Sequence, residues 1–137
     1  MVELQTRGQL ERTLSQKIQA YYRQQLGHQP SKISCQLFDS HLAIIVEDSI
    51  TPAEKLLVKE GKEALAEKVR FSLNDATKPE LKNLIEEILS VEVTDLLTDA
   101  TIETGRTGII AVLENPPQVR SSSTSSKVRR KNTSLQE

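Results

Sequence analysis

The first part of the chain places an apolar residue at every fourth position. These residues are Leu10, Leu14, Ile18, Tyr22 and Leu26. Because residues four apart share one face of a helix, the spacing predicts an amphipathic helix from about residue 6. Gly27 can adopt a positive φ without penalty, so we expect the helix to end there and Gly27, His28, Gln29 and Pro30 to form a loop.

From Ser31 the apolar period changes from four to two. Ile33, Cys35 and Leu37 alternate with polar residues, which predicts a strand with one buried face. The sequence FDSH at 38–41 predicts a turn, and 42–47 predicts a second strand. This second strand is apolar on both faces, which favours a central place in the sheet.

The segment 49–57, SITPAEKLL, carries the clearest helix start. The Thr51 hydroxyl can accept from the N–H of Glu54, and the Glu54 carboxylate can accept from the N–H of Thr51. Pro52 fits the first helical position, where no N–H is needed. Such a capping box stabilises a helix by about 1 kcal/mol. We interpret it first as a structural signal that starts the helix, without a direct role in function.

The following segment predicts two helices. The first runs from Thr51 to about Asn74, with Leu65, Val69 and Leu73 on one face, and Gly61 leaves an interruption open. The second starts where Thr77 and Glu80 again have capping-box spacing. Its apolar positions are Leu81, Leu84, Ile85, Ile88 and Leu89. A single kinked helix across Pro79 is the alternative, because Pro79 lies in the first turn after Thr77.

The segment 91–113 predicts a second hairpin. Val91 and Val93 lie on one face, whereas Leu96 and Ala100 have the opposite parity, so we expect a long strand with a bulge near 95–97. The sequence TGRTG at 104–108 predicts a turn with two glycines, and 109–113 predicts a short apolar strand.

These elements define an α+β domain over residues 1–114, in the order α, ββ, αα, ββ. The helices need one face of a sheet to cover their stripes, so we expect a four-stranded, mainly antiparallel sheet packed on helices. Residues 115–137 are rich in serine and basic residues and almost without apolar residues, so we expect a disordered tail.

Composition narrows the class of protein. Aromatic residues make up 3% of the 137 residues, so the core must be aliphatic. The longest apolar run, 42–46, is far shorter than the roughly 20 residues of a membrane-spanning helix. The N-terminus has no apolar signal stretch, and Cys35 is the only cysteine, so we expect a cytoplasmic protein without an intramolecular disulfide.

The net charge of −1 is unevenly distributed. The tail 115–137 carries five Lys and Arg against one Glu, a sum of +4, which leaves −5 on the first 114 residues. The basic cluster Lys127, Arg129, Arg130 and Lys131 could contact nucleic acid or an anionic membrane surface. The body has no basic stripe and no helix-turn-helix pattern, so we do not expect nucleic acid as a partner.

Cys35, His41 and His28 come closest to a metal or nucleophile set. Cys35 shares the apolar alternation of Ile33 and Leu37, so we interpret it as a structural cysteine. A zinc site normally takes four ligands of these types, and no further ones follow with motif spacing. We therefore expect neither a metal nor a cofactor.

Two further patterns have functional and structural interpretations. Asp95, Asp99 and Glu103 are spaced by four and could bind a divalent cation or act as paired acids, but exposed carboxylates on the wet face of a sheet explain them as well. The turn at 104–108 combines Gly105 and Gly108 with an arginine, which can favour an anion, but it lacks the phosphate-loop pattern and does not open a helix.

The chain resembles the MpsC-like domain family over about residues 5–114. The resemblance rests on GHQP at 27–30, Asp39, ITPAEKLL at 50–57, Gly61, Arg70 and LIEEILSVEV at 84–93. The family pattern prefers a second glycine where Gln29 stands and a glycine near Ser90. The positions that carry the family motif are Gly27, Pro30, Thr51, Glu54 and Arg70, and we interpret them as structural.

The resemblance implies a soluble accessory of membrane ion or inorganic-carbon transport, and it carries over no catalytic residue. If Arg70 lies on the buried side, it could pair with Glu54 or with an acidic residue of the sheet. We therefore expect a non-enzymatic accessory or regulatory domain that binds a protein partner, such as a membrane transporter component, and forms a homo-oligomer. The alternative is a small-ligand or anion sensor that uses the loops 27–30 and 105–108.

Overall fold

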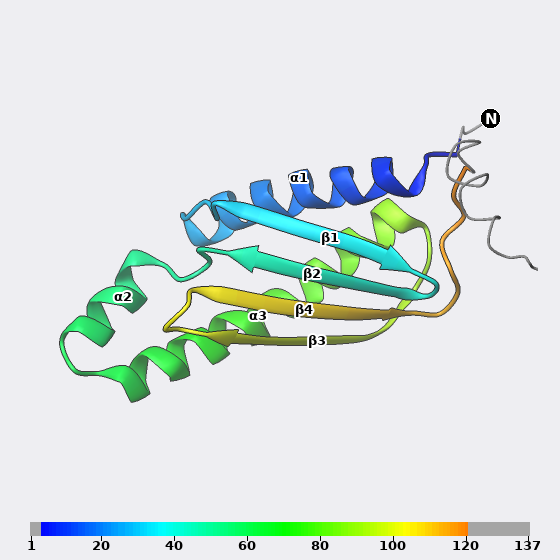
Figure 1. The fold of residues 1–137 in the computed structure, drawn as a ribbon. Coiled ribbons are helices and arrows are strands. Elements are labelled where there is room, and N and C mark those ends of the chain that lie inside the picture. Colours follow the sequence, from blue (N-terminus) through cyan, green and yellow to red (C-terminus); the bar gives the residue numbers. More distant parts are fainter. Residues whose placement is uncertain (1–3, 121–137) are drawn as a thin grey trace, which may run out of the picture.

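The computed structural model describes residues 4–120, which fold into three helices and four strands (Figure 1). In chain order the elements are α1 Arg7–Leu26, β1 Lys32–Phe38, β2 His41–Glu47, α2 Pro52–Lys59, α3 Glu63–Leu89, β3 Val93–Thr101 and β4 Arg106–Leu113. The predicted α+β class and the predicted order of elements are confirmed.

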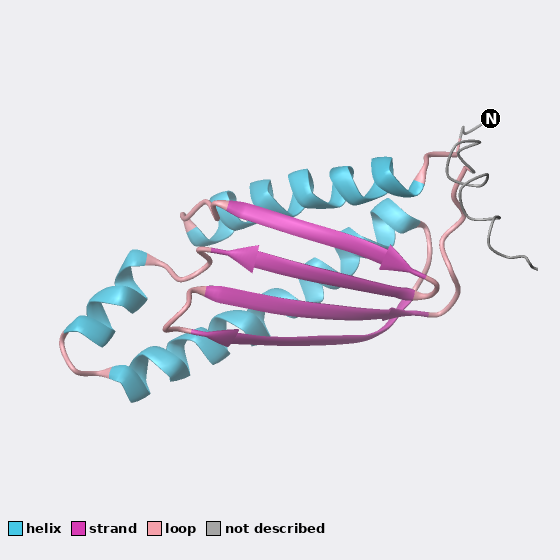
Figure 2. Ribbon diagram, viewed as in Figure 1, coloured by secondary structure: helices cyan, strands magenta, loops and turns pink. Residues whose placement is uncertain are grey.

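The four strands form one antiparallel sheet in the order β1-β2-β4-β3. Figure 2 shows the two hairpins side by side, with β2 and β4 in the middle. The central place predicted for the second strand is confirmed. The two hairpins are connected through α2, which lies beyond one end of the sheet, and α3, which crosses behind it (Figure 1).

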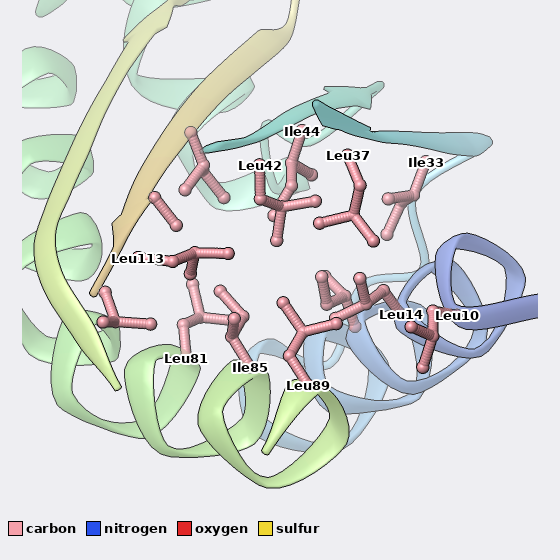
Figure 3. Packing of buried hydrophobic residues seen from close by; sticks show 14 of the residues in the cluster. Leu10, Leu14, Ile33, Leu37, Leu42, Ile44, Leu81, Ile85, Leu89 and Leu113 are labelled. Atoms are coloured by element: carbon pink, nitrogen blue, oxygen red, sulfur yellow. The ribbon is translucent and has the colours of Figure 1, made fainter. Parts of the chain in front are cut away.

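The hydrophobic core lies on one face of the sheet, between α1, α3 and the strands. The helices contribute Leu10, Leu14, Ile18 and Tyr22 from α1, and Leu81, Ile85 and Leu89 from α3. Figure 3 shows Leu14 of α1 and Ile85 of α3 pointing toward strand residues such as Leu42, which is fully buried. α1 packs along β1 and α3 along β3, so one face of the sheet is covered.

The ends of α1 confirm the helix predicted from its apolar stripe. Thr6 forms a capping box with Gln9, because its hydroxyl accepts from the Gln9 N–H and its own N–H donates to the Gln9 side chain at 2.8 Å. Gly27 adopts φ 64°, the left-handed conformation that glycine reaches without strain.

The helix boundary predicted near Asn74 is wrong, whereas the interruption left open at Gly61 is confirmed. The break falls at Gly61, with φ 78°, and not near Asn74. The N–H groups of Gly61 and Lys62 donate to the carbonyls of Val58 and Leu57 at 3.0 and 2.8 Å. This pattern is a Schellman motif, which ends α2 and lets α3 begin one residue later.

The chain remains helical through Pro79, as the alternative interpretation had it. The hydroxyl of Thr77 donates to the carbonyl of Asn74 at 3.1 Å, so it does not serve as an N-cap. The predicted stripe of Leu65, Val69 and Leu73 is also not the buried face, because Leu65 is exposed and the other two are half-buried. The helix turns Ala66 and Arg70 inward instead.

The second hairpin contains the predicted bulge, displaced toward the start of β3. The register shifts between Val93 and Asp95, so Thr94 is the extra residue. The bulge reverses the parity, and the half-buried Leu96 follows the buried Val93 onto the covered face. β4 begins three residues earlier than predicted, so Gly108 lies within the strand and only Gly105 lies in the turn.

Residues 115–120, the start of the predicted tail, run on without helix or strand, and the Arg120 N–H donates to the Gln5 carbonyl at 2.8 Å. The basic cluster and the rest of the predicted disordered tail, 121–137, lie outside the described residues. Within residues 4–120, no helix is both long enough and apolar enough to cross a membrane.

Replacing Ser90 by glycine should stabilise the domain. Ser90 ends α3 with φ 56°, a left-handed conformation that strains a residue carrying a Cβ. We expect Ser90→Gly to raise the free energy of unfolding by about 0.5–1 kcal/mol, measured by urea denaturation. Gly27→Ala, at φ 64°, is the opposite control and should lower it. Equal effects of the two changes would contradict this account of the helix ends.

Candidate functional site

The centre of the candidate site is an ion pair between Glu54 and Arg70. Glu54 lies in the first turn of α2 and is 0% exposed. Arg70 lies in the second turn of α3, on its buried face, and is 4% exposed. The Arg70 Nε and Nη2 atoms donate to Glu54 Oε2 and Oε1 at 2.8 and 2.6 Å. This two-point contact fixes the geometry of both side chains.

Further hydrogen bonds hold both members of the pair in place. Thr51 donates to Glu54 Oε1 through its backbone N–H at 3.0 Å and through its hydroxyl at 2.7 Å. Arg70 Nη2 also donates to the Ser49 carbonyl at 3.0 Å, and Nη1 donates to Asn74 Oδ1 at 3.3 Å. The capping box predicted from the sequence therefore exists, and it also presents the carboxylate to the guanidinium.

Ser49 connects the ion pair to the second hairpin. Its backbone N–H and its hydroxyl both donate to the Gly105 carbonyl, at 2.7 and 3.0 Å. The hydroxyl also lies 2.7 Å from the buried Thr107 hydroxyl. The pair and Ser49 thus join α2, α3 and the start of β4 at one end of the sheet.

The loop 27–30 lies at the same end. Pro30 is fully buried, and its carbonyl accepts from Gln19 Nε2 at 2.6 Å. His28 Nε2 lies 2.8 Å from the Asp48 carbonyl. The family-motif positions therefore lie together at one end of the sheet. They are Gly27, Pro30, Thr51, Glu54 and Arg70, and the contacts described for them are made with other residues of the same chain.

The electrostatics favour an ionised Glu54. Burial by itself raises the pKa of this carboxyl, but the hydrogen bonds from Arg70 and Thr51 outweigh burial and hold the pKa below its ordinary value. Burial likewise raises the pKa of the neighbouring Tyr22 hydroxyl, so Tyr22 stays neutral.

A cleft of about 640 Å³ opens beside the ion pair. Its walls are α2, the first half of α3, and the end of β3 with the turn that follows. Arg70 and Asn74 line it, together with the exposed Phe71. Its volume lies within the range of small-molecule sites, about 300–1,000 Å³.

The residues considered for nucleophilic or metal chemistry are kept apart. Cys35 points to the covered face of the sheet, whereas His41 belongs to the opposite set of alternating residues. Burial raises the pKa of the Cys35 thiol, and Ser15 Oγ lies 3.5 Å from its sulfur. A raised pKa keeps the thiol protonated, which agrees with a structural cysteine.

The acidic series is divided between a strand and a turn, and the arginine of the glycine turn is paired within the fold. Asp95 and Asp99 lie on the uncovered face of β3, and Glu103 lies in the turn beyond it. Within residues 4–120, no group of three or more His, Cys, Asp and Glu side chains is placed to hold a metal ion. Arg106 of the turn sequence donates to Glu47 Oε1 at 2.8 Å, in an exposed ion pair.

Two participants were missed by the sequence analysis. Asn74 stands four residues after Arg70, and this helical spacing was the available signal for their contact. Ser49 carried no such signal, because its role depends on the approach of Gly105 from a distant hairpin. Phe71, an isolated aromatic among polar residues of α3, was a further signal that went unused.

The fold and the ion pair define a class: a helix-backed, four-stranded antiparallel domain closed at one end by a buried carboxylate–guanidinium pair. The family model described as Na+-translocating membrane potential-generating system (MpsC) matches residues 6–115. The chain belongs to this family, which confirms the resemblance found in the sequence. No curated protein and no solved structure was found to match the chain.

Replacing Arg70 by methionine should strongly destabilise the domain. The change leaves the Glu54 carboxylate buried without its cation, and breaking such a pair typically lowers stability by about 3–5 kcal/mol. Arg106→Met is the matched control, because it breaks the exposed pair with Glu47 and should lower stability by less than about 1 kcal/mol. Urea denaturation measures both, and similar losses would contradict the central role of the Glu54–Arg70 pair.

The depressed pKa of Glu54 predicts a stability that falls in acid. The contribution of its ionised form is complete above the unfolded pKa, about 4.3, and is lost as the pH falls through the lower folded pKa. Between about pH 5 and pH 3 the free energy of unfolding should therefore fall more steeply for the native chain than for Glu54→Gln. Equal slopes for the native chain and Glu54→Gln would refute the prediction.

Proposed function

We propose that this chain is a non-enzymatic accessory or regulatory domain of a membrane ion-transport system, and that it binds a protein partner through the uncovered face of its sheet. The family name supports a connection with sodium-dependent generation of a membrane potential. In this proposal the domain works at the cytoplasmic side and carries no reaction of its own. The buried two-point contact between Glu54 and Arg70 supports a structural role for the family motif.

The observation that carries the proposal is the apolar centre of this face, here called the open face. It is formed by Ile45 of β2, Ile110 of β4 and Leu97 of β3, all exposed. Leu97 pairs with Ile110, and Ile110 pairs with Ala43, so the row crosses three strands. In Figure 1 the described helices leave this face uncovered.

A protein partner fits this face better than a small molecule, because the surface is broad. Gly108 lies between Ile45 and Asp99 in the register, and the Ile45 Cδ1 atom lies 4.0 Å from the position that a Cβ on Gly108 would take. Ile45 therefore leans over the glycine and flattens the centre. Exposed apolar patches framed by polar residues are typical of interaction sites.

An aromatic pair lies at one end of the open face. Phe38 and His41 stack there with ring centroids 5.2 Å apart. Among the described residues, His41 Nδ1 is a buried polar atom without a hydrogen-bond partner. This nitrogen lies beneath the surface, so the exposed Phe38 ring of the stack, and not a hydrogen bond, is what this end offers a partner.

The homo-oligomer belongs to the same proposal. A second copy would cover the open face of the free domain, and the membrane partner would replace that copy on binding. Self-association and partner binding would then depend on the same side chains.

The alternative, a sensor that binds an anion at the loops 27–30 and 105–108, finds less support. The Gly105 N–H donates to the Thr101 carbonyl, and its own carbonyl accepts from Ser49. Arg106 is paired with Glu47, and Thr107 is buried in β4. These groups are used within the fold and do not converge on an anion.

The test is affinity purification of the tagged full-length chain from detergent-solubilised membranes of its native cells. We expect an integral membrane transport protein to be recovered with the native chain and lost with Leu97→Lys. Leu56→Lys on α2 is the matched control, because Leu56 is 57% exposed and Leu97 is 58% exposed. Both substitutions are on the surface and should change stability by less than about 1 kcal/mol.

Size-exclusion chromatography with light scattering tests the oligomer. The native chain and Leu56→Lys should show the same concentration-dependent association, and Leu97→Lys should be monomeric. Recovery of the membrane protein with Leu97→Lys would overturn the assignment of the open face. Recovery of no membrane protein with the native chain would overturn the accessory role.

A further inference from the structure

The cleft exists because α3 changes character along its length. Its second half turns Leu81, Ile85 and Leu89 into the core, whereas the stripe of its first half that faces β3 is largely polar. The facing residues of β3, Thr98 and Ala100, are short. The apolar core therefore stops near Leu81, and space remains between the two elements.

The inner end of the cleft presents hydrogen-bond donors. Arg70 has five N–H groups, of which four are directed to Glu54, Ser49 and Asn74. The remaining N–H of Nη1 has no acceptor among the described residues. Asn74 accepts from Arg70 through Oδ1, which leaves its amide N–H₂ as a second donor group. Together they suit a carboxylate or carbonyl oxygen.

The cleft also has an apolar wall. Phe71 is 72% exposed, the most exposed large hydrophobic side chain of the described residues, and Val58 and Ile102 line the same space. Single exposed apolar residues are common on protein surfaces. Phe71 differs because it stands beside a cleft of defined volume whose inner end carries oriented donors.

The charges around the cleft discriminate between classes of ligand. Apart from Asp99, whose side chain lies on the uncovered face of β3, the described residues that line the cleft include four carboxylates and three cations. The carboxylates are Glu63, Glu67, Asp75 and Glu103, and the cations are Lys55, Arg70 and Lys78. The acidic excess disfavours a simple anion, and a simple cation would not use the donors of Arg70 and Asn74. A molecule that carries a negative and a positive group matches the donors of Arg70 and Asn74 with the first and the carboxylates of the cleft with the second.

We propose that the cleft binds a free amino acid. Its carboxylate accepts from Arg70 Nη1 and Asn74 Nδ2, its ammonium group faces the acidic rim, and its side chain lies against Phe71. The site is separate from the open face, so this inference is independent of the proposed protein partner. It would make the domain responsive to a small metabolite as well as to a protein.

The test is NMR titration of the ¹⁵N-labelled full chain with each standard L-amino acid in turn at millimolar concentration. At least one should produce saturable shifts in the amide signals of Phe71, Asn74 and Ala100, without shifts at Ile45 and Ile110 of the open face. For the tightest amino acid, the matching acid without the amine and the matching amine without the carboxylate should each bind at least about tenfold more weakly.

Two substitutions test the contacts without disturbing the buried pair. Phe71→Ala should weaken binding by about tenfold through loss of the apolar wall, whereas Leu56→Ala, which removes an exposed leucine outside the cleft, should leave it unchanged. Asn74→Asp keeps an acceptor for Arg70 but replaces the amide donor by a negative charge, so it should also weaken binding.

Absence of these shifts with every amino acid would overturn the proposal. If the matching acid without the amine binds equally well, the ligand need not be zwitterionic and this part of the proposal is wrong. If Phe71→Ala and Asn74→Asp both leave the affinity unchanged, the assigned contacts are wrong. Leu97→Lys should retain amino-acid binding, so failure here and failure of the open-face proposal are separate results.

Discussion

The ion pair between Glu54 and Arg70 is the constraint on which one end of this domain depends. A buried carboxylate and a buried guanidinium are each unfavourable alone, so the position of α2 requires that of α3. Ser49 extends the same constraint to the turn before β4 through Gly105. Three segments that are distant in sequence therefore share a single polar centre, and the rest of the fold is held by aliphatic packing.

The open face and the cleft both lie where the apolar core does not extend. With few aromatic side chains, the core fills only the space between α1, the second half of α3 and one face of the sheet. The other face keeps Ile45, Leu97 and Ile110 in contact with solvent, and the first half of α3 stands away from β3. β3 borders both surfaces, because its successive side chains alternate between them.

Local patterns predicted most of the fold, and contacts distant in sequence account for what they missed. The alternation in β1 and the capping box of Thr51 and Glu54 depend on neighbours within a few residues, and both were correctly predicted. A helix boundary was wrongly predicted near Asn74, because Thr77 and Pro79 form a sequence pattern typical of a helix start. Tertiary packing keeps α3 continuous there. The pairing of Arg70 with Glu54 was predicted only as one of two alternatives. The contact of Asn74 with Arg70 and the existence of the cleft were found only in the structure.

The hydrogen bond from Arg120 to Gln5 brings two remote stretches of the backbone together at the end of the sheet opposite the ion pair. The described chain is thus almost a closed ring. A short linker between these stretches would allow circular permutation, with new termini opened at the hairpin turn of Asp39 and Ser40. Such a permutation would leave the succession of elements around the ring unchanged.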